Sequence, residues 1–247
     1  MLQVNNLTKV FVKNKKNVVA VDNLNFNVNK GEIFGLIGTN GAGKTTTMRM
    51  IATILVPTSG TIDVCGYDTV KDSAKVRSSI GILFGGDTGL YDRLTARENI
   101  EYFAKLNGMS DEKTKSRIEF LAESFHLFDY LDRRCGTFSR GMKQKTSFAR
   151  AIVHDPDVML FDEPSAGLDI LAAEEVLKFI KQRKLEGKTI LLSSHDMAEV
   201  TELVDRAMII DKGRTLVVGT LKEILYKTET SDIKDAFIKL VDKSEMV

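Results

Sequence analysis

The stretch GTNGAGKTT, residues 38–46, places three glycines just before Lys44 and Thr45. A near-continuous apolar run, Ile33 to Ile37, comes before it, and a helical pattern follows from about Thr45 to Ala52. The apolar run is typical of a strand buried on both faces. A glycine-rich loop between such a strand and a helix lets successive backbone N–H groups surround phosphate oxygens, at the positive end of the helix.

The spacing of these residues is that of a P-loop. It predicts that Lys44 meets the β- and γ-phosphates of a nucleotide and that Thr45 ligates Mg²⁺. The alternative is a tight turn without a ligand, but the flanking strand and helix favour the phosphate site. The predicted ATP-binding residues of this loop are Gly38, Asn40, Gly41, Ala42, Gly43, Lys44, Thr45 and Thr46.

A second apolar strand ends in two carboxylates, in the sequence VMLFDEP at residues 158–164. A carboxylate at the carboxyl end of a buried strand lies where α/β sheets hold their ligands. We therefore expect Asp162 to join Thr45 in holding Mg²⁺. Glu163 is placed to accept a proton from an attacking water, as a general base does. Taken alone, the pair is equally typical of a surface strand end.

A third strand precedes a histidine, in LLSSHD at residues 191–196. If this strand lies beside the one that ends at Asp162, His195 points at the γ-phosphate. We expect Glu163, His195 and Lys44 to carry the chemistry. The other two histidines, His126 and His154, are interpreted as structural.

The stretch TFSRGMKQK, residues 137–145, has three cations and no carboxylate of its own to balance them. A solvated basic face on a helix is the simplest interpretation. A second one is an anion site, because Ser139 can cap the next helix and the amides around Gly141 resemble the environment of a P-loop.

Composition limits the class of protein. The chain has 247 residues, 43% of them apolar, and a formal net charge of +1, which argues against a dedicated nucleic-acid binder. Its two cysteines, Cys65 and Cys135, lie far apart, so a disulfide framework is not expected. No apolar run approaches the roughly 18 residues of a membrane span, and the N-terminus does not resemble a signal peptide. We expect a soluble protein that reaches a membrane only through a partner.

The remaining pattern predicts a single α/β domain over residues 1–225. Alternating residues such as Leu24, Phe26 and Val28 indicate an N-terminal antiparallel β subdomain. Helical periodicity dominates an insertion at about residues 90–154, which the capping box Thr95–Glu98 helps to open. Apolar strands alternate with helices afterwards. Residues 226–247 are predicted to be a charged helical tail, either docked or loosely held.

The order GTNGAGKTT, SRGMK, VMLFDEPSAGLD and SSHD resembles the ATP-binding cassette (ABC) ATPases, from Leu2 to about Gly219. The resemblance implies an α/β P-loop NTPase fold with a RecA-like core. It identifies FSRGM with the signature motif, typically LSGGQ, which binds the γ-phosphate of the other subunit's ATP in a head-to-tail dimer. Arg140 and Met142 depart from that pattern. By the same resemblance Ser139, Arg140 and Gly141 contact ATP in trans, and Phe11 stacks on adenine or belongs to the core. Ser165 to Asp169 form the D-loop, of which Asp169 is expected to belong to the nucleotide site.

One departure concerns the loop after Phe84, where the family normally has a glutamine that touches Mg²⁺ and the attacking water. This chain has Gly85 and Gly86 there. Asp87, or water alone, is the hypothesised replacement.

Three functions are compatible with these motifs. The chain is an energising subunit of a transporter, a soluble ABC ATPase acting on DNA or ribosomes, or a module that dimerises on ATP and hydrolyses little. The chain contains a single cassette without a coiled coil or zinc module, which favours the transporter subunit. We therefore expect no nucleic acid among its partners. GLYDRLTAREN and SRGMKQK resemble bacterial exporter ATPases for sodium, drugs or similar cargo. That resemblance implies a second cassette, most simply in a homodimer, and an integral-membrane permease that holds this chain at the cytoplasmic face of the membrane. Leu90, Tyr91 and Phe103 are candidates for the permease groove, or for the core.

Overall fold

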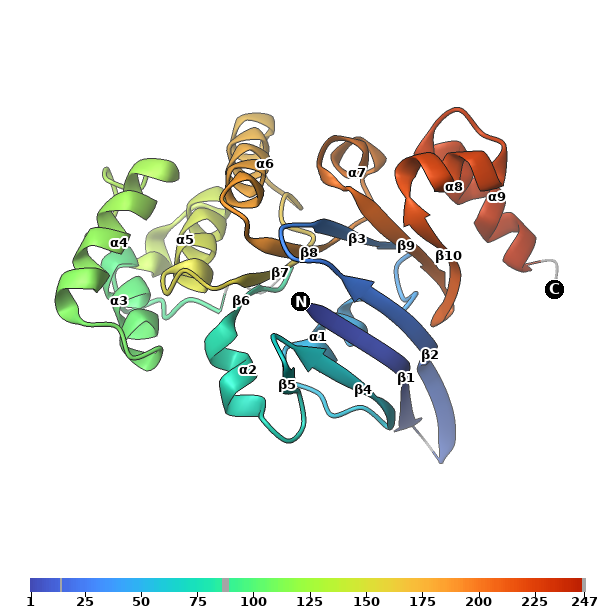
Figure 1. The fold of residues 1–247 in the computed structure, drawn as a ribbon. Helices are drawn as coiled ribbons and strands as arrows, with labels where there is room; N and C mark the ends of the chain where they lie inside the picture. The colour runs from blue at the N-terminus through green and yellow to red at the C-terminus, as the bar shows by residue number, and fades with distance from the viewer. Residues whose placement is uncertain (14, 86–88, 246–247) are drawn as a thin grey trace.

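A six-stranded sheet forms the centre of the computed structural model, which describes residues 1–13, 15–85 and 89–245 (Figure 1). Five strands run parallel, in the order β9-β3-β8-β7-β6, and β10 pairs antiparallel with β9 at the edge. The bounds are β3 Ile33–Gly38, β6 Ile80–Leu83, β7 Val158–Asp162, β8 Thr189–Ser194, β9 Arg206–Asp211 and β10 Arg214–Thr220. The predicted strand beside the one ending at Asp162 is therefore present, since β7 and β8 are neighbours.

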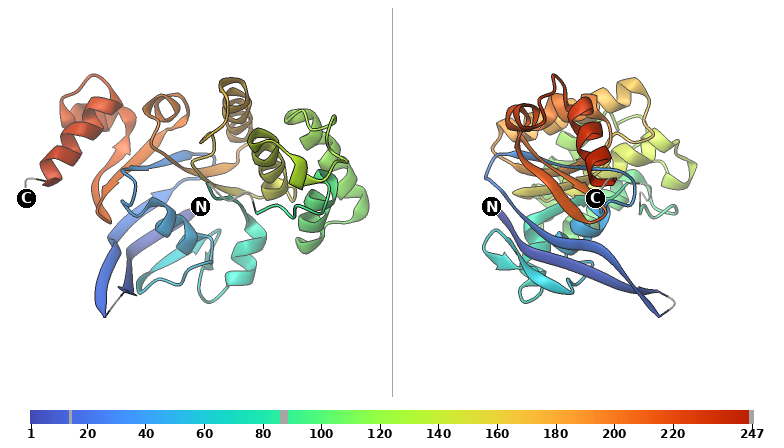
Figure 2. Two further views of the ribbon diagram at one scale, coloured as in Figure 1. Left: turned by 180° about the vertical axis from the view of Figure 1, so that it is seen from behind. Right: turned by 90° about the vertical axis from the view of Figure 1, so that its right-hand side faces the viewer.

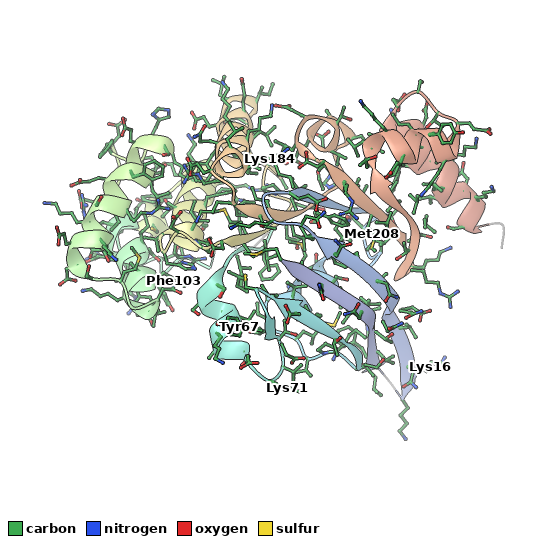
Figure 3. The ribbon with its side chains drawn as sticks, in the orientation of Figure 1. Lys16, Tyr67, Lys71, Phe103, Lys184 and Met208 are labelled. Atoms are coloured by element: carbon green, nitrogen blue, oxygen red, sulfur yellow. The ribbon has the colours of Figure 1, made fainter. Side chains whose placement is uncertain are left out.

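A second, antiparallel sheet is built from the N-terminal part of the chain, as the alternating pattern predicts. Its order is β2-β1-β4-β5, with bounds Lys16–Val28, Leu2–Lys13, Ser59–Val64 and Tyr67–Asp68. Figure 3 labels Lys16 in β2 and Tyr67 in β5. Helix α1, Lys44–Ile51, lies between the two sheets, and α2, Ser73–Ser79, leads into β6 (Figure 1).

The central sheet is buried on both faces, because successive side chains of a strand point to opposite sides. Phe34 and Leu36 pack in one apolar cluster with α1 and the small sheet. Ile33 and Ile37 pack in a second cluster with α6, Ile170–Leu185, and α7, Met197–Leu203. This arrangement confirms the interpretation of the apolar runs as strands covered on both sides.

A helical subdomain is inserted between β6 and β7. It contains α3 Ala96–Leu106, α4 Asp111–Ser124, a 3₁₀ turn Cys135–Thr137 and α5 Arg140–Ile152. The predicted capping box opens α3, because the Thr95 side chain accepts from the N–H of Glu98 while the Glu98 carboxylate accepts from the N–H of Thr95. The fold is therefore the predicted P-loop NTPase core with an antiparallel β subdomain and a helical insertion.

Two helices close the chain, at the opposite end of the molecule from the helical subdomain (Figures 1 and 2). They are α8, Leu221–Thr228, and α9, Ile233–Glu245. Ile224, Ile233 and Ala236 are buried in the second apolar cluster, so this segment is docked on the core. The predicted division between residues 225 and 226 falls within α8. Among the helices of the described residues, none is long and apolar enough to cross a membrane.

Candidate active site

The loop between β3 and α1 has the backbone that its glycines permit. Gly41 and Gly43 have φ of 84° and 107°, a region that side chains disfavour. A Cβ at Gly43 would lie 2.6 Å from the carbonyl oxygen of Ala20. The loop surrounds a pocket of about 130 Å³ that is lined by Ala20, Asn40, Gly41, Gly43, Lys44, Thr45, Thr46 and Glu163. Of the predicted loop residues, Gly38 and Ala42 do not line the pocket.

Lys44 is buried at the base of this loop, with only 5% of its surface exposed. Its Nζ donates to the carbonyl oxygens of Gly38, at 2.7 Å, and Thr39, at 3.1 Å. Burial lowers the pKa of Lys44, and the nearby carboxylates of Glu163 and Asp162 act in the opposite direction. Anionic oxygens accept stronger hydrogen bonds than neutral carbonyls do, so a phosphate is a better partner than either carbonyl.

Asp162 and Thr45 come together from β7 and α1. The Oγ1 of Thr45 donates to Oδ2 of Asp162 at 2.8 Å, and the hydroxyl of Ser193 donates to Oδ1 of Asp162. Hydroxyl and carboxylate oxygens are the hard ligands that Mg²⁺ prefers, and Mg²⁺ usually keeps waters and phosphates as its other ligands. Thr45 and Asp162 therefore fit the predicted ion. The described residues contain no cluster of three or more His, Cys, Asp or Glu that could hold a metal without such ligands.

Glu163 and His195 meet beside the P-loop pocket. The Oε1 atom of Glu163 lies 3.1 Å from Nδ1 of His195. Glu163 has a positive φ of 51°, and its N–H donates to the carbonyl of Ser193 at 3.0 Å. With this backbone conformation Glu163 forms part of the lining of the pocket. The structure thus brings Lys44, Thr45, Asp162, Glu163 and His195 into one site.

Two residues of the site were not predicted from the sequence. Ser193, on β8, contacts both acidic residues, since its hydroxyl donates to Asp162 and accepts from the N–H of Glu163 at 3.2 Å. Glu199, on α7, is buried and accepts from Ser165 Oγ at 3.2 Å and from Ser194 Oγ. Burial raises the pKa of Glu199, and its two serine donors act in the opposite direction. Glu199 thereby connects the SAGLD loop to the strand that precedes His195.

The basic stretch at residues 137–145 begins helix α5. Ser139 caps that helix, as predicted, since its Oγ accepts from the N–H of Met142 at 3.3 Å. Two of the three cations have carboxylate partners from distant parts of the chain. The Nζ atom of Lys143 lies 3.0 Å from Oδ1 of Asp92, and Lys145 forms an ion pair with Glu175. Carboxylates that lie outside the stretch therefore balance the charges of these two lysines.

Arg140 lies against the SAGLD loop. Its guanidinium occupies the space that a Cβ at Gly167 would take, and Gly167 itself has a φ of 74°. None of Ser139, Arg140 and Gly141 lines the P-loop pocket of its own chain as the structure describes it. Their contact with ATP stays a prediction.

Phe11 and Asp169 also lie outside the pocket lining. Phe11 is 40% exposed on β1, opposite Val18 of β2, so it is not a core residue. The Lys9 ammonium is 5.3 Å from the centre of its ring. Adenine stacking by Phe11 stays a prediction. Asp169 caps α6 by accepting from the N–H of Ala172 at 2.9 Å.

The loop after Phe84 is described only in part. Gly86 and Asp87 lie outside the described residues, so the metal role of Asp87 stays a hypothesis. Gly85 is described, and a Cβ there would lie 2.9 Å from the carbonyl oxygen of Asp162. A glycine therefore allows this loop to pass close to the end of β7.

Comparison with known proteins agrees with the nucleotide site that the geometry indicates. The profile of the ABC transporter family matches residues 21–166. The chain is 49% identical to the ABC transporter ATP-binding protein NatA of Bacillus subtilis, over 94% of each chain. It is 35% identical to the linearmycin resistance ATP-binding protein LnrL of the same organism, over 96% of this chain and 78% of that one.

Solved structures of ATP-binding cassettes share the fold. One, an ATP-binding subunit of an ABC transporter, has a TM-score of 0.89 and 30% identity, covering 98% of this chain and 99% of that one. Another is a dimeric cassette in a post-hydrolysis state with ADP and phosphate, with a TM-score of 0.83 and 26% identity over 90% of this chain and 99% of that one. The chain therefore belongs to the ABC transporter family and is an ATP-binding cassette ATPase.

Proposed function

We propose that this ATPase drives a membrane-embedded permease for export, as one half of a head-to-tail dimer that holds two ATP molecules. ATP hydrolysis by this chain is supported by one observation: Glu163, which lines the P-loop pocket, contacts His195. The export direction is supported by relatives that are named for drug resistance or export, among them the Nod factor export ATP-binding protein I of Paraburkholderia xenovorans, which is 37% identical over 88% of this chain and 71% of that one.

In the proposed reaction, water attacks the γ-phosphorus of ATP and the bond to the β–γ bridging oxygen breaks, which gives ADP and phosphate. Glu163 accepts a proton from the water, and its bond to His195 fixes the direction of the carboxylate. Lys44 exchanges its two carbonyl partners for phosphate oxygens and balances their charge. Such transfer depends mainly on positioning and on charge stabilisation, and these residues supply both.

Mg²⁺ is part of the proposal, with Thr45 and Asp162 as its protein ligands. When bound, it neutralises charge on the phosphate oxygens. Ser193 holds one oxygen of Asp162 and leaves the other directed at Thr45. This fixed orientation is what the chain contributes to an ion site.

Each ATP is proposed to be contacted by both copies of the dimer, by the P-loop of one copy and by the start of α5 of the other. The first turn of α5 offers the N–H of Gly141 and the hydroxyl of Ser139, at the positive end of a 13-residue helix. Neither residue lines the P-loop pocket of its own chain, so the γ-phosphate that they are proposed to contact is the one held by the P-loop of the second copy. Phe11 is proposed to stack on adenine, at a contribution of roughly 1–3 kcal/mol.

The permease is proposed to dock in a groove between the core and the helical subdomain. This groove has a volume of about 320 Å³ and includes Arg77 and Ile80 from the core and Phe103, Leu106 and Arg150 from the insertion (Figure 3 labels Phe103). Of the three predicted lining residues, Phe103 lines it, while Leu90 packs on the apolar core and Tyr91 is exposed against Tyr102.

Affinity purification from cells, after mild detergent solubilisation, tests this proposal. We expect a stoichiometric multi-spanning membrane protein to stay bound to this chain, which is proposed to lie at the cytoplasmic face of the membrane. Leu106→Asp should release it, because Leu106 is 62% exposed in the groove. Leu185→Asp is the control, since Leu185 is 80% exposed but lies outside the groove. Recovery of ribosomes or DNA in place of a membrane protein would contradict the transporter function.

A further inference from the structure

Glu199 is a buried acidic residue that the proposed reaction does not use. It is 4% exposed, and its hydrogen-bond partners are two neutral hydroxyls, those of Ser165 and Ser194. Burying a carboxyl group costs free energy that an apolar residue of similar size would not cost. Packing of α7 on the core therefore does not account for an acidic residue at this position.

The position of Glu199 in α7 would also allow a purely local role. Asp196 is the N-cap of α7, and Glu199 is the third residue of the helix. A glutamate at this position often accepts from the N–H of the cap residue, as Glu98 does at the start of α3. In α7 the N–H of Asp196 donates instead to Oγ of Ser194, at 3.0 Å. The carboxyl group of Glu199 is thus left for the two serines.

These serines flank the two residues that meet beside the P-loop pocket. Ser165 comes two residues after Glu163. Ser194 comes directly before His195. Oε1 of Glu199 accepts from Ser165 Oγ at 3.2 Å, and Oε2 accepts from Ser194 Oγ. One carboxyl group therefore links the segment that carries Glu163 to the segment that carries His195.

The link lies beyond the end of the β7–β8 ladder. Asp162 and Ser193 are the last pair of the ladder, and the N–H of Glu163 donates to the carbonyl of Ser193. His195 comes after this point, and its side chain is 60% exposed, so packing does little to fix it. A cross-link beyond the ladder limits how far the two segments move apart.

We propose that Glu199 is a positioning residue for ATP hydrolysis. It holds the SAGLD loop, residues 165–169, against the turn at residues 194–196 and thereby keeps His195 in contact with Glu163. Glu199 is not among the described residues that line the P-loop pocket, so it acts through His195. This inference rests on the proposed role of Glu163 and His195 in hydrolysis.

ATP turnover, measured in the wild type and in the His195→Ala background, tests the proposal. Glu199→Leu removes both acceptor oxygens and keeps a side chain of similar volume. In the wild type it should lower kcat about tenfold or more, because small displacements of reacting groups are costly. The Kd of ATP should change by less than about twofold, because the P-loop is untouched. In the His195→Ala background kcat should fall by less than about twofold, since the residue through which Glu199 acts is already gone.

Glu202→Leu is the matched control. Glu202 lies on the same helix and pairs with Lys181 at the surface. Because exposed ion pairs contribute little, this substitution should change kcat by less than about twofold in either background.

Two smaller changes carry the test where Glu199→Leu does not fold. Ser165→Ala and Ser194→Ala each remove one donor to Glu199, and each should lower kcat in the wild type but not in the His195→Ala background. Glu199→Gln keeps one oxygen that accepts from a serine, so its kcat should lie closer to that of the wild type.

The outcomes separate this inference from the proposed function. Unchanged kcat of Glu199→Leu in the wild type, or an equal loss in both backgrounds, would overturn the positioning role. If His195→Ala turns over ATP at the wild-type rate, the proposed role of the Glu163–His195 pair fails and this inference fails with it. If His195→Ala is slow and Glu199→Leu is not, the role of that pair stands and only the positioning by Glu199 is wrong.

Discussion

The Nδ1 atom of His195 lies 3.1 Å from Oε1 of Glu163, across the carboxyl ends of two neighbouring parallel strands. The pairing of β7 with β8 sets this distance, with Asp162 opposite Ser193 in the ladder. Glu163 follows with a positive φ and contributes to the lining of the P-loop pocket. The sheet register therefore determines which carboxylate faces the phosphate site.

His195→Ala should reduce ATP turnover about 10²-fold, because Glu163 loses the ring that orients it. The overall fold should be kept, since His195 is a largely exposed side chain. Steady-state phosphate release measures the effect. His126→Ala is the control: His126 is also exposed, and it lies near Glu175, outside the site. Equal turnover in the two variants would count against a role for the His195–Glu163 bond.

Ser193→Ala should lower both turnover and stability. The Ser193 hydroxyl is buried and donates to Asp162, so its removal leaves a buried carboxylate oxygen without that donor. A loss of about 1–3 kcal/mol in the free energy of unfolding is expected. Denaturant unfolding measures it, with Ser78→Ala as the control because Ser78 is exposed on α2. Equal stability of the two variants would contradict the assigned hydrogen bond.

Gly43→Ala should destabilise the nucleotide-free chain more than Gly41→Ala does. Both glycines have positive φ, so both substitutions introduce backbone strain of about 1–3 kcal/mol. Only at Gly43 does the added Cβ meet a backbone atom, the carbonyl oxygen of Ala20, whereas no atom lies within 4 Å at Gly41. Thermal unfolding of the two variants without ATP measures the difference. A lower melting temperature for Gly41→Ala would mean that the loop differs from this structure.

Glu199→Gln should change how stability depends on pH. Burial raises the pKa of Glu199 above its ordinary value of 4.5, so the folded chain favours the protonated carboxyl. The stability linked to this group is fully present below pH 4.5 and is lost as pH rises through the raised pKa. As the pH increases from 4.5 through the raised pKa, the wild type should therefore lose free energy of unfolding relative to Glu199→Gln. Denaturant midpoints at a series of pH values test this, and a constant difference between the two chains would rule it out.

Much of the fold follows from local patterns in the sequence. The apolar runs at Ile33–Ile37 and Val158–Phe161 are continuous because both faces of those strands are covered. A glycine-rich loop that joins such a strand to a helix is the usual form of a phosphate site. The capping box at Thr95 is equally local. For these features the residues that determine the structure are close together in the chain, so a pattern reveals them.

The parts that sequence did not predict depend on long-range contacts. Glu199 looks like any acidic residue of a charged helix until α7 packs on the core and buries it. The partner of Lys143 is Asp92, which is 51 residues away, and Arg140 lies on Gly167 through the packing of α5 beside the SAGLD loop. The charged C-terminal pattern also does not separate α8 from α9. No local pattern encodes which of these surfaces meet.

The central claim is tested most directly by ATP turnover and ATP-dependent dimerisation of the Glu163→Gln variant, measured on the same sample. Glutamine keeps the shape of the side chain but does not act as a base. The account predicts turnover that is lower by about 10²–10⁴-fold, together with a dimer that forms when ATP and Mg²⁺ are added. Turnover at the wild-type rate would contradict the assignment of Glu163 as the proton acceptor.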